Sequence, residues 1–457
     1  MAIETAIIKL RNLLQDRLVT TQAILDQHGQ NEAYFPVTPP DAVAYPQNTD
    51  EVSQIVKICA AEACPIIAYG TGTSLEGHQL AFRGGVSLNM QKMNAVLAVH
   101  PQDLDAVVQP GVTRKQLNTE LRATGLFFPV DPGADASLGG MAATRASGTT
   151  AVRYGTMKEN VMALEVVMAD GKIIRTGSRA RKSSTGYDLT KLFVGSEGTL
   201  GIITELTVKL HGQPEAISAA TCSFPDISSA VDTVIATIQM GIPMARIEFI
   251  DNIMVRGFNA YNGSDLPEVP HLFVEFHGSD SAVAEQASQF GEIVKDMGGD
   301  EFQWSANAEE RKKLWDMRHN AYYAQKAVRP GSVVQNTDIC VPISHLAEVI
   351  LETKAEGDRL GLTFTVVGHV GDGNFHCGIC IDPDDKSELA NARIFTENLA
   401  MRALKFNGTV SGEHGIGVGK MKYMADEHGD ALSVMGDIKR VLDPQNIMNP
   451  GKLIPMN

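Results

Sequence analysis

Hydrophobic and polar residues alternate along this chain with two different periods. A spacing of three and four between Val52, Ile55, Val56 and Cys59 predicts a helix that is capped by Thr49 or Asp50. Alternation with a period of two predicts strands in segments such as 65–70, 86–90, 95–100 and 201–210. Asp170-Gly171 separates two alternating runs and predicts a β-hairpin, and Thr113 with Gln116 predicts a capping box.

The pattern changes after residue 213. Strands are predicted at 245–251, 271–278 and 332–342, and helices at 228–240 and 310–323. This order indicates an antiparallel sheet with helices on one face, so the fold class is α+β. We predict an N-terminal helical segment at 1–35, a first domain at 36–213, a second domain at 214–420 and a helical tail at 421–457.

Composition narrows the kind of protein. The chain has 457 residues, 44% of them hydrophobic and 20% charged, with a net charge of −15. Such a charge argues against a nucleic-acid partner, which requires a broad basic surface. The acidic residues of the first helix argue against a signal peptide, and no apolar run reaches the ~18 residues that cross a bilayer. Six cysteines are few for this length, so we expect a cytoplasmic location, with peripheral contact to the inner membrane left open.

Three glycine-rich loops, at 68–77, 128–148 and 192–204, indicate an anion site. The first is not a dinucleotide fingerprint because Leu75 stands where glycine is required. It is not a Walker A loop either, because His78 and Gln79 replace the lysine and the hydroxyl residue. A ligand-free turn explains this loop equally well by itself. The three loops together favour a large cofactor with an internal pyrophosphate.

The stretch VGHVGDGNFHCGIC at 367–380 predicts a hairpin that brings His369 and His376 side by side. Glu413 is the candidate for a third ligand, which would complete a site for Zn²⁺ or Mn²⁺. From the residues alone, the favoured interpretation is two hairpin histidines bonded to backbone and a solvated acid. A redox CxxC is not expected, because Cys377 and Cys380 should point to opposite faces of a strand.

Motifs in both halves resemble those of one flavoprotein family. GTGTSLEG, DPG…SLGGM…ASG…RYGT and GSEGTLGIIT are similar to the FAD-contacting segments of the vanillyl-alcohol-oxidase (PCMH-type) flavoproteins. HVGDGNFH and GEHG match the metal motifs of one group within it, which contains the D-lactate dehydrogenases (cytochrome), the glycolate oxidase D-subunits and the D-2-hydroxyglutarate dehydrogenases. The resemblance covers residues 36 to 457. It implies a PCMH-type FAD-binding domain of two α+β subdomains, completed by the tail, and a substrate (cap) domain that holds a metal.

The resemblance also implies which residues contact FAD. Thr73 stands where some relatives tether the flavin through a histidine, so non-covalent FAD is expected, with covalent attachment at His78 as the alternative. The implied pyrophosphate loop is Gly70, Thr71, Gly72, Thr73 and Ser74, near Gly77 and His78. The implied lining of the site is Pro132, Gly133, Ser137, Gly140, Thr144, Ser147, Gly148, Glu197, Gly201, Ile202 and Asn449.

In the second half the resemblance implies catalytic roles. It makes His369, His376 and Glu413 metal ligands, His414 the base that takes the hydroxyl proton, and Arg318 the partner of the substrate carboxylate. By itself, Arg318 would be interpreted as a surface arginine of a helix. The lysine that the 2-hydroxyglutarate enzymes carry near Asn336 is missing, which favours a small monocarboxylate.

We therefore expect FAD- and metal-dependent oxidation of a D-2-hydroxy acid, with D-lactate (giving pyruvate) favoured over D-2-hydroxyglutarate or glycolate. Electrons would pass to a cytochrome, a quinone or an electron-transfer flavoprotein and not to NAD, because the chain has no dinucleotide fingerprint. Two other classes stay open: a metal-dependent hydrolase without flavin, and a non-catalytic flavin-binding subunit of a larger complex. A homodimer is also left open.

Overall fold

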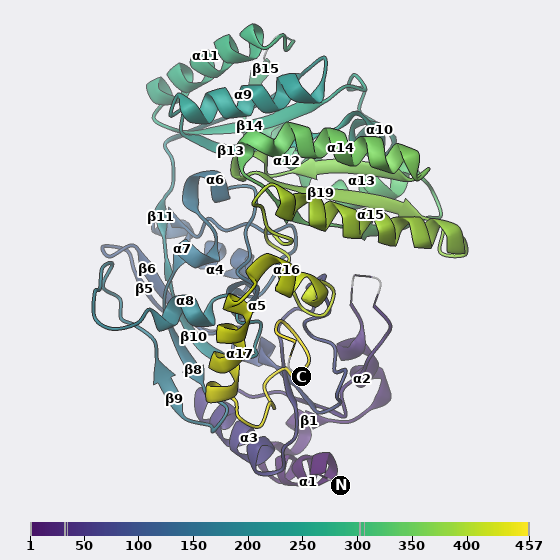
Figure 1. Ribbon diagram of the computed structural model, residues 1–457. Helices are drawn as coiled ribbons and strands as arrows, with labels where there is room; N and C mark the ends of the chain where they lie inside the picture. The colour runs from purple at the N-terminus through teal and green to yellow at the C-terminus, as the bar shows by residue number, and fades with distance from the viewer. Residues whose placement is uncertain (1, 32, 34, 301–302, 306, 456–457) are drawn as a thin grey trace. The chain divides into compact units, whose positions relative to one another are not determined.

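The computed structural model describes residues 2–31, 33, 35–300, 303–305 and 307–455 of the chain. The chain folds into two compact units. Unit 1 comprises Met1–Ser147, Gly155–Gln213 and Glu413–Asn457, and unit 2 comprises Gly148–Tyr154 and Pro214–Gly412. Helices and sheets occur in both units (Figure 1).

Unit 1 contains a four-stranded sheet in the order β1-β2-β4-β3. Strands β2, β4 and β3 are parallel, and β1 pairs antiparallel with β2. Helices α1 and α3 share an apolar core with this sheet. The predicted helix begins at Thr49, but its cap is Asn48 and the predicted cap, Thr49 or Asp50, is wrong. The Asn48 side chain accepts from the Glu51 N–H. The elements are α1 (Ala2–Leu14), β1 (Leu18–Val19), α2 (Gln22–Gly29), β2 (Ala42–Ala44), α3 (Thr49–Ala61), β3 (Ile66–Tyr69) and β4 (Val86–Asn89).

The second sheet of unit 1 is antiparallel, in the order β5-β6-β10-β8-β9. Its β8–β9 hairpin confirms the turn predicted at Asp170-Gly171. The predicted capping box is only half formed: the Thr113 hydroxyl accepts from the Gln116 N–H, but the Gln116 side chain donates to the Asn94 carbonyl instead. The strands are β5 (Val96–His100), β6 (Asp105–Val108), β7 (Leu126–Phe127), β8 (Val161–Val167), β9 (Ile173–Arg175), β10 (Ile202–Lys209) and β11 (His211–Gly212), and the helices are α4 (Arg114–Glu120), α5 (Leu138–Thr144), α7 (Met157–Asn160) and α8 (Leu189–Phe193).

The C-terminal tail is part of unit 1. It contains α16 (Met424–His428) and α17 (Ala431–Leu442), followed by an extended segment beside β3. The Ile66 N–H donates to the Ile447 carbonyl and the Asn449 N–H donates to the Ile66 carbonyl, both at 2.8 Å. Lys439 of α17 is buried, and its ammonium donates to the Thr199 and Met448 carbonyls and to the carboxylate of Asp443.

Unit 2 is built on one large antiparallel sheet, in the order β15-β12-β14-β13-β18-β19-β16, with β17 paired to β19. The predicted strand at 332–342 is two short strands, which both pair with β19 and are separated by Thr337 and Asp338. The strands are β12 (Ala216–Ser223), β13 (Met244–Ile250), β14 (His271–Gly278), β15 (Gln303–Ser305), β16 (Val333–Asn336), β17 (Ile339–Cys340), β18 (Thr363–Gly368) and β19 (Asn374–Ile381).

The two faces of this sheet differ in polarity. On one face Ile247, Phe249, Val274 and other apolar residues share a core with the helices α9 (Ile227–Gln239), α11 (Asp280–Asp296), α14 (Leu346–Arg359) and α15 (Lys386–Lys405). The sequence predicted helices on only one face of the sheet. A smaller group, α10 (Asn252–Asn262), α12 (Ala308–His319) and α13 (Ala321–Val328), forms a second apolar cluster with Phe273 and Val367. That second face also carries buried ionisable side chains, such as Glu248, Glu275 and His277.

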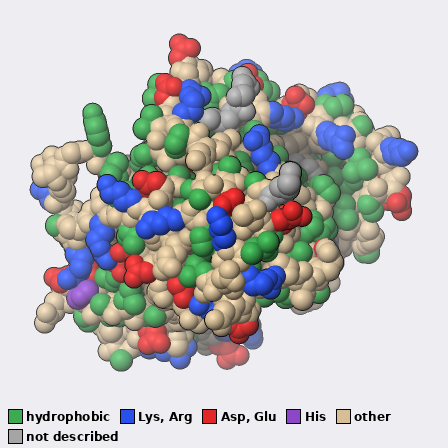
Figure 2. Space-filling model, turned by 90° about the horizontal axis from the view of Figure 1, so that it is seen from below, with side chains coloured by type: hydrophobic (Ala, Val, Ile, Leu, Met, Phe, Trp, Pro, Cys, Tyr) green, Lys and Arg blue, Asp and Glu red, His purple; other side chains and the backbone are tan. Residues whose placement is uncertain are grey.

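Charged side chains of both signs are interspersed on the face of the molecule shown in Figure 2. Ion pairs among the described residues include Arg17 with Glu51, and Arg175 with Glu165 and Glu205. Among the helices described, none combines the length and apolar character needed to cross a membrane.

The tail offers a test of how strongly a buried ion pair holds it. In Asp443→Asn the buried ammonium of Lys439 loses its counter-charge, which should cost about 3–5 kcal/mol of stability. The matched control is Asp316→Asn, because Lys312 and Asp316 form an exposed pair with the same spacing of four residues. That substitution should cost no more than about 0.5 kcal/mol. Thermal unfolding of both variants measures the difference, and equal melting temperatures would contradict it.

Candidate active site

The three glycine-rich loops and the tail meet in unit 1. A Cβ built on Gly70 would lie 2.3 Å from the Ser137 hydroxyl oxygen, so the first loop closely approaches the second. The Glu197 N–H donates to the Ala143 carbonyl at 2.9 Å, which joins the third loop to the second. Gly72 and Gly77 have φ values of +77° and +75°, a region that favours glycine. The loops therefore form one glycine-lined cradle of the kind that fits a phosphate-containing cofactor.

A network of buried polar groups joins these loops to the tail. The Asn449 side-chain amide donates to the His78 carbonyl at 3.1 Å and to the Glu197 carbonyl at 2.7 Å. The Lys452 ammonium donates to the Asn449 side-chain oxygen at 2.6 Å. Nε2 of His78 lies 3.2 Å from the Glu197 carboxylate, and His78 Nδ1 is buried without a hydrogen-bond partner among the described residues. An unpartnered buried nitrogen here is consistent with a ligand in the cradle.

Glu197 is ionised in this network. Burial alone would raise its pKa, but the charge of His78 and hydrogen bonds from His78 and from the Ile416 and Gly417 N–H groups lower it. The carboxylate thus ties the third loop to the segment that follows Gly415.

Some predicted FAD contacts have other visible roles. Ile202 is buried in the core beside the first sheet, and a Cβ on Gly201 would lie 2.7 Å from Val166. Gly133 has open space around it, and the Thr144 hydroxyl donates to the Gly140 carbonyl. Gly148 is the first residue of unit 2. Their contacts with FAD stay predictions, as do those of Pro132 and Ser147.

The hairpin predicted at 367–380 is formed by β18 and β19. Val367 is paired with His376, and His369 follows the last residue of β18. Gly373, with a φ of +76°, closes the turn, and a Cβ there would lie 2.0 Å from the Val341 carbonyl. The imidazole rings of His369 and His376 are 5.5 Å apart between centroids. Cys377 lies in the apolar core that the sheet shares with α9, α11, α14 and α15, and the Cys380 thiol contacts the Gln325 carbonyl. The two cysteines therefore face opposite sides of the sheet, as predicted.

Glu413 joins the two histidines. It directly follows Gly412, the last residue of unit 2, and one ligand atom each from His369, His376 and Glu413 lies within 4.8 Å of the others. His376 donates its Nδ1–H to the Thr337 carbonyl at 3.2 Å, which places the lone pair on Nε2. Two imidazoles and one carboxylate at this spacing fit a divalent cation such as Zn²⁺ or Mn²⁺.

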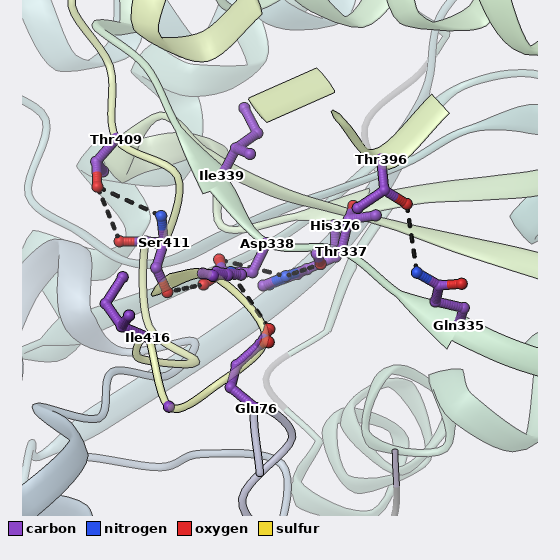
Figure 3. Close-up of polar contacts among 12 residues, drawn as sticks. Glu76, Gln335, Thr337, Asp338, Ile339, His376, Thr396, Thr409, Ser411 and Ile416 are labelled. Carbon is purple, nitrogen blue, oxygen red and sulfur yellow. Dashed lines mark hydrogen bonds and ion pairs between the residues drawn. The ribbon is translucent and has the colours of Figure 1, made fainter. Parts of the chain in front are cut away.

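Asp338 holds the segment that leads to Glu413. Its carboxylate accepts from the Ser411 hydroxyl at 2.8 Å (Figure 3). It also accepts from the Asn374 amide at 2.7 Å. The Thr409 N–H and carbonyl pair with Cys340, which fixes the same segment to β17. Asp338 lies in the break between β16 and β17, which the sequence did not predict, and its role was missed for that reason.

Glu248 is a second residue that the sequence did not identify. Its side chain on β13 accepts the Nδ1–H of His369 at 2.7 Å and also pairs with Arg318, at 2.9 Å from Nε and 2.6 Å from Nη2. All three side chains are buried. Arg318 is thus an internal residue of α12, and the expectation for an isolated helix, a surface arginine, is wrong.

A similar trio lies on the neighbouring strand. Glu275 of β14 accepts from His277 Nε2 at 2.8 Å, and its carboxylate lies 3.5 Å from Arg246. Burial would raise the pKa of Glu275, but His277 and the charge of Arg246 lower it. The hydroxyl of Tyr154 lies 2.7 Å from His277 Nδ1. The polar face of the sheet therefore carries two Arg-Glu-His trios, of which only the one with Glu248 includes a candidate metal ligand.

Two family models match the chain. The model described as "FAD binding domain" matches residues 40–177, and the model described as "FAD linked oxidases, C-terminal domain" matches residues 213–453. The second match alone covers more than half of the chain.

Curated relatives match over nearly the whole chain. A probable D-lactate dehydrogenase, mitochondrial, of Danio rerio is 51% identical over 100% of this chain and 93% of its own. A D-lactate dehydrogenase [cytochrome], mitochondrial, of Arabidopsis thaliana is 46% identical over 98% of this chain and 79% of its own. Glycolate oxidase subunit GlcD of Bacillus subtilis is 34% identical over 91% of this chain and 89% of its own.

Solved structures share the fold at lower identity. p-Cresol methylhydroxylase with substrate bound superposes with a TM-score of 0.81 at 19% identity, over 99% of this chain and 96% of that chain. Alkyldihydroxyacetonephosphate synthase gives a TM-score of 0.77 at 19% identity, over 98% and 86%. These flavoprotein neighbours confirm the predicted fold class, a PCMH-type FAD-binding domain with an α+β second domain.

Gly412 provides a test of the segment that positions Glu413. In Gly412→Ala the new Cβ would lie 2.1 Å from the Asn374 amide nitrogen, which cannot yield because it is bonded to Asp338 and to the Ile339 carbonyl. We expect Zn²⁺ binding, measured by equilibrium dialysis, to weaken about 10-fold or more, with FAD retained. Gly212→Ala is the control, because nothing lies within 4 Å of its Cβ. Zn²⁺ affinity equal to wild type in Gly412→Ala would refute the expectation.

Lys452 predicts a pH dependence of stability. Burial lowers its pKa to about 7 against the opposing charge of Glu197, whereas an unfolded lysine has a pKa of ~10.4. Between these values the unfolded chain binds a proton that the folded chain does not, so stability rises with pH. From pH 7 to 9 this one group should add about 2 kcal/mol to the unfolding free energy.

Urea unfolding of the FAD-free protein at both pH values, for wild type and Lys452→Met, measures the contribution of Lys452. The increase in unfolding free energy from pH 7 to pH 9 should be smaller in Lys452→Met than in wild type by about 2 kcal/mol. An identical gain in the two proteins would show that Lys452 keeps an ordinary pKa.

Proposed function

We propose, from the premise that this chain belongs to the FAD-linked oxidases and within them to the D-lactate dehydrogenase group, that it oxidises D-lactate to pyruvate with non-covalent FAD and a divalent metal. The single observation that carries the metal-dependent part is the cluster of His369, His376 and Glu413, with His414 next in the chain and Arg318 tied to His369 through Glu248.

The chain's own residues would handle the two ends of the substrate. Arg318 would bind the substrate carboxylate, since Glu248 holds its Nε and Nη2 and a guanidinium has further N–H donors. His414 would accept the proton of the C2 hydroxyl as a general base. His369, His376 and Glu413 would hold a divalent cation whose chemistry is to polarise that hydroxyl. Loss of this proton and of a hydride from C2 leaves the 2-oxo acid.

Unit 1 would hold the flavin. When bound, FAD supplies the acceptor for the hydride that leaves C2. The residues that fit the cofactor are those of the cradle: Gly70 to Ser74 beside Ser137, Glu197 of the third loop, and Asn449 of the tail. We assign residues 36–213 and the tail 421–457 to the flavin-binding part and 214–420 to the substrate part. The helical segment 1–35 precedes them.

The names of the relatives bear on the electron acceptor and on the location of the protein in the cell. The name "D-lactate dehydrogenase [cytochrome]" of the Arabidopsis relative supports a cytochrome as acceptor, with a quinone or an electron-transfer flavoprotein as alternatives. The same relative is named mitochondrial, so the cytoplasmic location stays a prediction. Dimerisation also stays a prediction.

Anaerobic bleaching of the flavin tests the substrate directly. The purified protein should be yellow, with absorbance near ~450 nm, and D-lactate should bleach it faster than D-2-hydroxyglutarate, glycolate or L-lactate. Steady-state rates with a dye acceptor then rank kcat/KM for the same acids. A preference for D-2-hydroxyglutarate would refute the proposed substrate.

Two variants test the role of the His369, His376 and Glu413 cluster. His376→Ala and Glu413→Ala should keep the yellow colour and lose bleaching, because they remove the cluster and leave the cradle intact. A colourless wild-type protein, even after FAD is added, would favour the hydrolase alternative. A yellow wild-type protein that no hydroxy acid bleaches would favour the non-catalytic subunit.

A further inference from the structure

One carboxylate, that of Glu248, contacts two side chains with different proposed tasks. Oε1 accepts the Nδ1–H of His369 at 2.7 Å, and Oε2 accepts from Nε and Nη2 of Arg318 at 2.9 and 2.6 Å. The Glu248 side chain is fully buried, and Arg318 and His369 are more than nine-tenths buried. These three groups are thus a hydrogen-bonded unit that is buried from solvent.

The contact with His369 fixes the form of the imidazole. Nδ1 of His369 carries the proton that is donated to the Glu248 carboxylate. The lone pair of the imidazole is therefore on Nε2, where it can bind a cation. A carboxylate behind a ligating imidazole also makes that nitrogen more basic and holds the ring plane.

The contact with Arg318 fixes the position of the guanidinium on α12. Trp315 and Arg318 are the buried residues of this helix, AEERKKLWDMRH, which is mostly charged. Trp315 packs in the apolar cluster with α10 and α13, whereas the Arg318 guanidinium is held by its contacts with Glu248. Glu248 is thus hydrogen-bonded to both Arg318 and His369.

We propose that Glu248 is a positioning residue that sets the separation between the carboxylate anchor, Arg318, and the metal ligand His369. This inference rests on the proposed function, in which those two groups bind the carboxylate and polarise the hydroxyl of one 2-hydroxy acid. Those functional groups are on adjacent carbons of the substrate, so their partners on the protein must keep a fixed spacing.

The second trio supplies a matched control inside the same sheet. Glu275 is buried, pairs with an arginine and accepts from a histidine, as Glu248 does. Its histidine, His277, is not in the metal cluster. Removal of the negative charge of Glu248 or of Glu275 disturbs a buried Arg-Glu-His contact. Only the change at Glu248 affects a candidate metal ligand, His369.

The experiment compares Glu248→Gln with Glu275→Gln as FAD-loaded proteins without substrate. Equilibrium dialysis with Zn²⁺ should show about 10- to 100-fold weaker binding in Glu248→Gln and no change in Glu275→Gln. Glu248→Asp, which keeps the charge, should bind Zn²⁺ more tightly than Glu248→Gln. At saturating Zn²⁺, KM for D-lactate should rise in Glu248→Gln, because Arg318 loses its fixed position.

Two outcomes overturn the inference alone. In the first, wild type binds Zn²⁺ and Glu248→Gln binds it equally well. In the second, Glu275→Gln weakens as much as Glu248→Gln, which would reduce Glu248 to general stabilisation of the fold. A wild-type protein that binds no Zn²⁺ would overturn the metal part of the proposed function together with this inference. A different preferred acid, with the Zn²⁺ result as expected, would overturn the proposed substrate and leave the role of Glu248 at His369 supported.

Discussion

Buried charge on one face of the large sheet is the constraint on which unit 2 depends. An ionised side chain away from water is tolerated only when it is paired and hydrogen-bonded, since its desolvation costs several kcal/mol. Glu248, Glu275 and Asp338 each meet this condition with two or more partners. Because every partner must stay in place, the polar face is held by directional contacts, while the opposite face is held by ordinary apolar packing.

This constraint explains both what the sequence could predict and what it could not. The alternation with a period of two predicted the strands. The glycines of the turn predicted the hairpin that brings His369 and His376 together. Glu248 could not be assigned a role, because its partners are 70 and 121 positions away and no local pattern links them. A signal was nevertheless present. ARIEFID and HLFVEFHG carry ionisable residues at alternate positions of strands whose other residues are apolar, which marks a polar face.

The flavin cradle depends on a different constraint, close approach of backbone. Gly70 next to Ser137, and Glu197 bonded to Ala143, leave no room for larger residues or displaced loops. The sequence predicted the loops from their glycines, but it could not predict that Asn449 would bond to the loop of His78 and to that of Glu197. Such a contact joins positions over 250 residues apart and requires the extended tail segment beside β3.

The same charge pairing bears on which acids the site can accept. A dicarboxylate needs a second cation beyond the one that binds the carboxylate next to the hydroxyl. Arg246 is two positions from Glu248 on the same strand face, but it is already matched by Glu275. The strand that ends at Asn336 supplies no lysine there. Under the proposed function Arg318 serves the carboxylate next to the hydroxyl, and a small monocarboxylate such as lactate avoids the cost of desolvating a second one.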